Sequence, residues 1–450
     1  MVAKIARLSI YVFLSLFITG LFCGPVRADD SITLISDAET QKYLADIVQP
    51  LYQAAGLAFN PNKIYIVRDN SLNAFVSDGN YMFVHTGTLI EAENTNELSG
   101  ILAHETGHIL GGHIVRQKIK MQKMQYMMLG SMIAAGAAAV STGRGDAAMA
   151  VVLGSQSAAL NTMLHYQVQE ERSADESAVK LLNKTGQSTK GLLNFMNKIK
   201  QKNILSGLEE NAYFRTHPMT NERISHFKEA EKTNHHPTAH KLDSKFAMVK
   251  AKIAAFLLDK DKVNRMYPAT DNSAPARYAR AVSAFRQGNI PQALNLIDGL
   301  LKENPSNPYF YELKGQFLFE SGQVQQSIKA YEKALQLLPN NYLLQVSLAH
   351  ALIESTPNKQ NIQRAISLLQ KSLYTVNTPF AWQLLARAYD MNNQRAASYY
   401  AAAEYSYADD NLETAKRQLL NARKAGADKS LSLKISDLEQ RIKEDEKERE

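Results

Sequence analysis

Hydrophobic and polar positions change their period along the chain and so divide it into segments. Residues 31–57 have the spacing of a helix, whereas three short β-prone runs follow between residues 64 and 84. Asp78-Gly79, a dipeptide typical of hairpin turns, separates the last two runs. The pattern therefore predicts a mainly α-helical protein with a small antiparallel β-ribbon near its N-terminal end.

A repeat of 34 residues runs through the C-terminal half of the chain. Four pairs of similar residues stand at this spacing: Gly288 and Gly322, Ala293 and Ser327, Leu301 and Leu335, and Pro305 and Pro339. This is the period of the tetratricopeptide repeat, in which stacked helix pairs bury a core that no single repeat can close. We expect a polar linker at 233–245, an α-helical solenoid with a concave peptide-binding face at 246–430, and a charged helix at 431–450.

The first 28 residues have the organisation of a secretory signal peptide. Lys4 and Arg7 precede an apolar stretch, and small residues around Ala28 form a cleavage site. An uncleaved anchor, or lipid attachment at Cys23, is the alternative. Removal of residues 1–28 would leave a chain without cysteine, so any metal site must use histidine and carboxylate ligands.

Charge and composition change this picture only at two points. The chain has 51 Lys and Arg against 44 Asp and Glu, and loss of the three basic residues in the signal leaves 48 against 44. This mild, unclustered excess argues against a nucleic-acid partner. Within 124–169, which is rich in Ala, Gly and Met, only Arg144 and Asp146 are charged. We expect a helical hairpin in solution or at a membrane surface, and a transmembrane hairpin is the alternative.

The clearest candidate for a catalytic site is the H-E-x-x-H motif from His104 to His108. It lies on a helix predicted from Asn94 to about Arg116, because Asn94 is a good N-cap and Glu97 follows three residues later. Residues four apart on a helix differ by about 40° around its axis, so both imidazoles can face one metal ion. The motif therefore predicts a metal-dependent hydrolase.

A catalytic zinc site needs a third protein ligand and one open position. His113 is one candidate, but it is one residue short of the longer H-E-x-x-H-x-x-G-x-x-H spacing. Glu171 is the better candidate, because a second predicted helix would present it one turn before Asp175. Asp175 could then hold the free nitrogen of a ligand histidine.

Taken together, these motifs resemble the HtpX and Oma-type family of zinc metallopeptidases. The resemblance rests on Asn73-Ala74-Phe75, Tyr81 to Val84, Thr86-Gly87, Glu97-Leu98, His104 to His108, Glu171 to Asp175, and Thr216-His217-Pro218 to Arg223. It implies a zincin-type metallopeptidase domain at 29–232. It also implies one zinc ion per chain on His104, His108 and Glu171, with Glu105 as general base and Asp175 holding a ligand. The similarity further suggests that His217 takes the fourth zinc position in a latent state.

The resemblance implies a biological setting as well. It points to the periplasm of a Gram-negative bacterium, where the protease would degrade misfolded or stalled outer-membrane proteins. The repeats would then recruit these clients or the outer-membrane barrel-assembly machinery. The hairpin at 124–169 would lie near the active site, where it can contact a membrane peripherally.

The sequence also predicts how substrate binds and leaves two rival functions open. We expect a strand that pairs with extended substrate, formed by Tyr81, Met82, Phe83, Val84 and His85. The first rival function is a chaperone or assembly scaffold with a largely latent metal site. The second is an integral membrane protease, if residues 124–169 span the bilayer.

Overall fold

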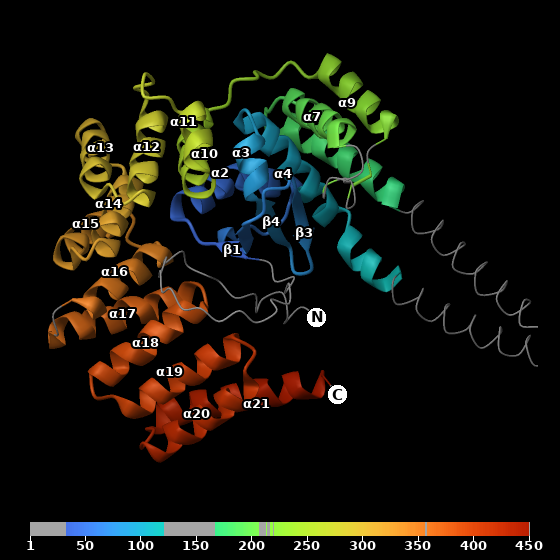
Figure 1. Cartoon of the computed structure of the whole chain (residues 1–450). Coiled ribbons are helices and arrows are strands. Elements are labelled where there is room, and N and C mark those ends of the chain that lie inside the picture. Colours follow the sequence, from blue (N-terminus) through green and yellow to red (C-terminus); the bar gives the residue numbers. More distant parts are fainter. Residues whose placement is uncertain are drawn as a thin grey trace, which may run out of the picture. The chain divides into compact units, whose positions relative to one another are not determined.

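The computed structural model describes residues 33–120, 167–206, 213, 217–218, 220–355 and 358–449 (Figure 1). The predicted signal peptide and most of the hairpin predicted at 124–169 therefore lie outside the described residues. Two compact units make up the chain. The N-terminal unit comprises Tyr43–Tyr65 and Asp69–Phe246, and the repeat unit comprises the described residues of Met1–Lys42 and Ala247–Glu450 together with Ile66–Arg68. In the described residues no helix is both long and apolar enough to cross a membrane.

The small sheet has four strands in the order β1-β2-β4-β3. Their bounds are β1 Leu34–Ile35, β2 Ile64–Val67, β3 Ala74–Ser77 and β4 Tyr81–His85. Strands β3 and β4 form the predicted antiparallel hairpin, and Ser77 lies opposite Tyr81. Gly79 and Asn80 close it with φ angles of 81° and 62°, which glycine and asparagine tolerate best.

The position of β4 contradicts one prediction about substrate binding. Because β4 is hydrogen-bonded to both β2 and β3, its backbone has no free edge for an extended peptide. The prediction that Tyr81–His85 pairs with substrate is therefore wrong, and β1 and β3 are the strands at the two edges of the sheet. Residues 31–57 are also not one helix, because β1 precedes helix α2 (Ala38–Ala55). Asp37 begins that helix by accepting a hydrogen bond of 2.8 Å from the backbone N–H of Thr40.

Helix α4 (Thr95–Leu110) is the central helix of the N-terminal unit and is buried from Thr95 to Ile109. Asn94 caps it as predicted, accepting a hydrogen bond of 3.1 Å from the backbone N–H of Glu97. The helix ends earlier than expected, because Gly112 adopts a φ of 62° and a second helical segment starts at residue 113. The other helices of this unit are α3 (Thr86–Glu91), residues 167–184, α7 (Lys190–Ser206) and α9 (Asn221–Thr233).

The repeat unit consists of paired antiparallel helices, which confirms the repeat architecture (Figure 1). It opens with α10 (Asp243–Leu257) and α11 (Lys260–Met266). The pairs are α12 (Ala274–Arg286) with α13 (Ile290–Glu303), α14 (Pro308–Glu320) with α15 (Val324–Leu337), α16 (Tyr342–Glu354) with α17 (Lys359–Thr375), α18 (Pro379–Met391) with α19 (Arg395–Ala408), and α20 (Leu412–Lys424) with α21 (Lys429–Lys447). Buried Ala293 and Ser327 show why the repeat keeps small residues where helices meet.

One buried ammonium group joins several elements of the repeat unit. Lys252 is 3% exposed, and its Nζ lies 2.5 Å from Asp37, 3.5 Å from Glu312 and 3.7 Å from Glu39. The hydroxyl of Tyr278 donates a hydrogen bond of 2.9 Å to Glu39. Burial raises the pKa of Glu39 to about 7, and the negative charges of Asp37 and Glu312 add to this shift, although Lys252 and the Tyr278 hydrogen bond oppose it.

We predict that Glu39→Gln stabilises the repeat unit at high pH. A carboxyl group whose pKa is higher in the folded state than in the unfolded chain destabilises the fold as pH rises. Here the stability is lost between pH 4.5, near the pKa in the unfolded chain, and about pH 7, the pKa in the folded state. Gln can still accept the Tyr278 hydrogen bond but carries no charge. The variant should exceed wild type in free energy of unfolding by roughly 1–3 kcal/mol at pH 8. The difference should shrink toward pH 4.5 in denaturant titrations, and Glu413→Gln, at an exposed position, is the control for loss of a surface carboxylate.

Candidate metal centre

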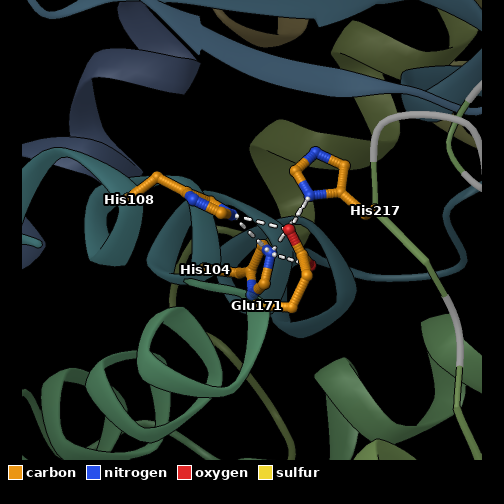
Figure 2. A group of neighbouring side chains, drawn as sticks. All are labelled: His104, His108, Glu171 and His217. Carbon is orange, nitrogen blue, oxygen red and sulfur yellow. Dashed lines mark hydrogen bonds and ion pairs between the residues drawn. The ribbon is translucent and has the colours of Figure 1, made fainter. Parts of the chain in front are cut away.

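Three parts of the N-terminal unit bring the candidate residues together. Helix α4 contributes His104 and His108, the helix at 167–184 contributes Glu171, and the chain before α9 contributes His217 (Figure 2). Glu105 also lies on α4. One ligand atom from each of His104, His108, Glu171 and His217 lies within 4.8 Å of the other three, and all four residues are buried. His113, the alternative third ligand, is not in this group.

The ligand atoms of His104, His108 and Glu171 converge on one point. The Nε2 atoms of His104 and His108 are 3.1 Å apart, and each lies 3.3 Å from an oxygen of Glu171. Close packing of two helices makes this possible. A Cβ at Gly107 would lie 2.7 Å from the carbonyl oxygen of Ala174, so only glycine lets the helix at 167–184 approach α4 this closely.

Asp175 lies behind the ring of His104. Its Oδ1 is 2.8 Å from Nδ1 of His104, on the side of the ring away from the cluster. A carboxylate in this position keeps the proton on Nδ1 and leaves Nε2 as the electron-pair donor. The second helix therefore supplies both Glu171 to the cluster and the group that orients His104.

Arg223 is a functional residue for which the sequence analysis assigned no role. It is 5% exposed and donates to both oxygens of Asp175, from Nε at 2.6 Å and from Nη2 at 2.9 Å. Its Nη1 lies 2.9 Å from Glu171 and also donates to the carbonyl oxygen of Pro218, next to His217. The guanidinium thus holds two carboxylates and the chain that bears His217. Its place at the end of the family-like segment was the only signal for it in the sequence.

The surroundings set the protonation of the cluster residues. Burial lowers the pKa of His104, but the hydrogen bonds that its ring donates to Asp175 and Glu171 outweigh burial and raise it to about 10, so binding of a metal ion at Nε2 would release a proton. Burial is the main reason that the pKa of His108 falls to about 4, so its imidazole is neutral at neutral pH. Burial also raises the pKa of Glu105, which favours a carboxyl group able to accept and return a proton.

The residues present fit a transition-metal site. Three imidazoles and one carboxylate form a donor set suited to zinc, and the described residues contain no thiolate ligand. Both carboxylate oxygens of Glu105 are buried without a hydrogen-bond partner among the described residues. A carboxylate beside convergent ligands is placed to accept the proton of a water that a metal ion would activate.

Fold and site define a metallopeptidase followed by a tetratricopeptide solenoid, and comparisons with known proteins agree. Residues 38–231 match Peptidase family M48, and residues 278–342 match a tetratricopeptide repeat family. The metallopeptidase match lies on the segment that holds the candidate metal centre, and the resemblance found in the motifs is confirmed.

Individual relatives are similar to the chain over most of its length. It is 25% identical to the beta-barrel assembly-enhancing protease of Yersinia pestis over 434 residues, which cover 91% of this chain and 83% of the relative. The protein of the same name from Escherichia coli (strain K12) is 22% identical over 398 residues, which cover 83% of this chain and 77% of the relative. Among solved structures, MamA from Desulfovibrio magneticus RS-1 is 19% identical with a TM-score of 0.30, and the match covers 38% of this chain and 98% of MamA.

We predict that Glu171→Ala removes most of the bound metal. The substitution deletes one ligand and leaves Arg223 without one of its carboxylate partners, whereas both histidines of the motif stay in place. Metal content after dialysis should fall well below one ion per chain. Glu170→Ala is the matched control, because this neighbouring carboxylate pairs with Lys120 instead of the cluster. Equal metal content in the two variants would remove Glu171 from the ligand set.

Proposed function

We propose that the chain is a zinc-dependent metalloendopeptidase of the periplasm that degrades misfolded or stalled outer-membrane proteins. The observation that carries this proposal is the buried convergence of His104, His108 and Glu171 beside the carboxylate of Glu105. The names of the relatives connect such proteases with β-barrel assembly. The signal peptide predicted in residues 1–28 supports export to the periplasm.

In this proposal His104, His108 and Glu171 hold the zinc ion. Zinc bound there would polarise the scissile carbonyl group and acidify the attacking water. Glu105 takes the proton from that water and passes it to the amine that leaves when the peptide bond breaks. Its burial suits both steps, because the raised pKa of Glu105 brings the acceptance and release of a proton closer to neutral pH. Asp175 and Arg223 keep His104 and Glu171 in place during turnover.

We predict that Glu105→Gln abolishes peptidase activity and retains zinc. The variant removes the base but no ligand, and glutamine nearly preserves the side-chain volume. Degradation of an unfolded outer-membrane protein by the mature chain should fall by at least about 100-fold, as general-base removal commonly costs. Zinc content should stay at the wild-type level. Equal degradation by both proteins would reject the hydrolase and favour the assembly scaffold.

The position of His217 supports a latent state. Its Nδ1 lies 3.0 Å from Glu171 and 3.4 Å from Nε2 of His104, and its Nε2 lies 3.5 Å from Glu105. A neutral imidazole at this place would take the position that substrate or catalytic water needs. We propose that His217 is the fourth zinc ligand of a resting form. This arrangement also favours, as the second candidate function, a scaffold whose metal site is mostly latent.

We predict that His217→Ala retains zinc and degrades a generic unfolded protein severalfold faster than wild type. Removal of the imidazole leaves the three other ligands in place and opens the fourth position. Zinc content and the initial rate of casein degradation measure the two effects. Loss of zinc or a slower rate would instead make His217 a required ligand or a substrate-binding residue.

The repeat unit is proposed to recruit clients or the barrel-assembly machinery. A cavity of about 130 Å³ opens within this unit, below the range of about 300–1,000 Å³ that is usual for small-molecule sites. Its lining combines aromatic rings and carboxylates, from Phe256, Phe319, Tyr331, Phe380, Asp37 and Glu312. A cavity of this size suits one side chain of a bound protein segment, which supports recruitment of a protein partner.

A further inference from the structure

His108 has a hydrogen-bonding partner outside the ligand cluster. The Nδ1 atom of His113 lies 2.8 Å from Nδ1 of His108, whereas Nε2 of His108 faces His104 and Glu171. His113 is 3% exposed. The contact joins the nitrogen of His108 that does not face the cluster to a second buried imidazole.

A break in helix α4 makes this contact possible. In a continuous helix, residues five apart differ by about 140° around the axis, so His113 would face away from His108. Gly112, with its φ of 62°, ends the helix and redirects the chain. A Cβ at Gly111 would overlap the ring of His113, so glycine at that position leaves room for the ring. Both glycines are therefore needed to place the ring of His113 next to the ring of His108.

The chemistry of the contact determines which nitrogen carries the proton. A histidine that binds metal through Nε2 must carry its proton on Nδ1. That N–H needs an acceptor, and Nδ1 of His113 is at hydrogen-bonding distance and accepts when the proton of a neutral His113 is on Nε2. That Nε2 is itself buried without a hydrogen-bond partner among the described residues. Asp175 does the same for His104, at 2.8 Å. Each histidine of the H-E-x-x-H motif thus has its own partner behind the ring.

We propose that His113 is a positioning residue of the metal centre, which accepts the Nδ1–H of His108 and so directs Nε2 of His108 to the metal ion. This inference rests on the metal site proposed above. It assigns to His113 a role different from the ligand role considered in the sequence. The acceptor is uncharged, so it orients His108 without adding a further negative charge to a site that already contains Glu105, Glu171 and Asp175.

Zinc affinity of the full mature chain tests the proposal, measured at pH 7.5 by competition with a chromophoric chelator. His113→Ala should weaken zinc binding by about 10- to 100-fold, as the loss of such a partner commonly does. His113→Asn should restore affinity to within a few-fold of wild type, because its Oδ1 provides an acceptor at the same branch of the side chain. Gly111→Ala should behave like His113→Ala, since the added methyl displaces the ring.

A second readout separates positioning from general stability. Cobalt(II) in place of zinc should give an altered visible absorption spectrum in His113→Ala and a wild-type-like spectrum in His113→Asn. Melting temperatures of the metal-free proteins should agree between these variants and wild type. His235→Ala, which removes an exposed imidazole from the linker, is the matched control and should change neither affinity nor spectrum.

The outcomes separate this proposal from the metal site itself. Wild-type affinity and spectrum in His113→Ala would overturn the proposal while leaving the metal site intact. Equal weakening in His113→Ala and His113→Asn would assign the effect to packing and would also overturn it. If the wild-type chain bound no zinc at all, the proposed metal site would fail first. If His113→Ala did not fold, Gly111→Ala and His113→Asn would still decide the question.

Discussion

The guanidinium of Arg223 is the charge on which the centre of the N-terminal unit depends. Glu171 and Asp175 are both buried, and Arg223 contacts both of them at 2.6–2.9 Å. Two carboxylates removed from water without a cation would each cost several kcal/mol. With Arg223 present they can stay ionised beside the imidazoles. The same side chain reaches the carbonyl oxygen of Pro218, so one cation organises both the ligand helix and the chain that carries His217.

The helices around this charge are placed by contacts that only small residues permit. Gly107 lets the helix at 167–184 touch α4, and Gly100 allows α7 to approach the same helix next to Leu192. Because α4 is buried over nearly its whole length, its motif residues have little freedom to move. Rigid placement matters here, since metal ligands must converge to within tenths of an ångström. The buried helix thus provides the precision that a loop could not.

Local rules predict one part of this molecule well and fail for another. The helix period alone predicts that both histidines of the H-E-x-x-H motif lie on one face. Local hydrogen bonding predicts the Asn94 cap, and the spacing of 34 residues predicts the repeats. These features depend on neighbours in sequence. The interior position of β4 depends on which strands flank it, and no local pattern contains that information.

Local patterns predict no role for Arg223 and only a ligand role for His113, for a related reason. Arg223 lies 48 residues from Asp175, and their pairing appears only once α9 has packed against the helix at 167–184. His113 is close to His108 in sequence, but a continuous helix would separate the two rings. Only the positive φ of Gly112 brings them together, and a Gly-Gly pair near a helix end is equally consistent with a simple C-terminal cap.

The proposed resting form, with His217 in the cluster, would have an energetic consequence for activation. His217 contacts Glu171 and Glu105, and its ring also lies 4.6 Å from the ring of buried Tyr213, centre to centre. Its backbone N–H donates a hydrogen bond of 2.7 Å to the carbonyl oxygen of Tyr213. Several contacts must therefore be lost together when the imidazole leaves. A bound protein shifts the equilibrium toward the form without His217 in the cluster, the open form, only if it binds that form more tightly. Each tenfold difference in affinity contributes about 1.4 kcal/mol. A client with many weak contacts to the open form, such as an extended unfolded chain, meets this requirement better than a compact folded protein.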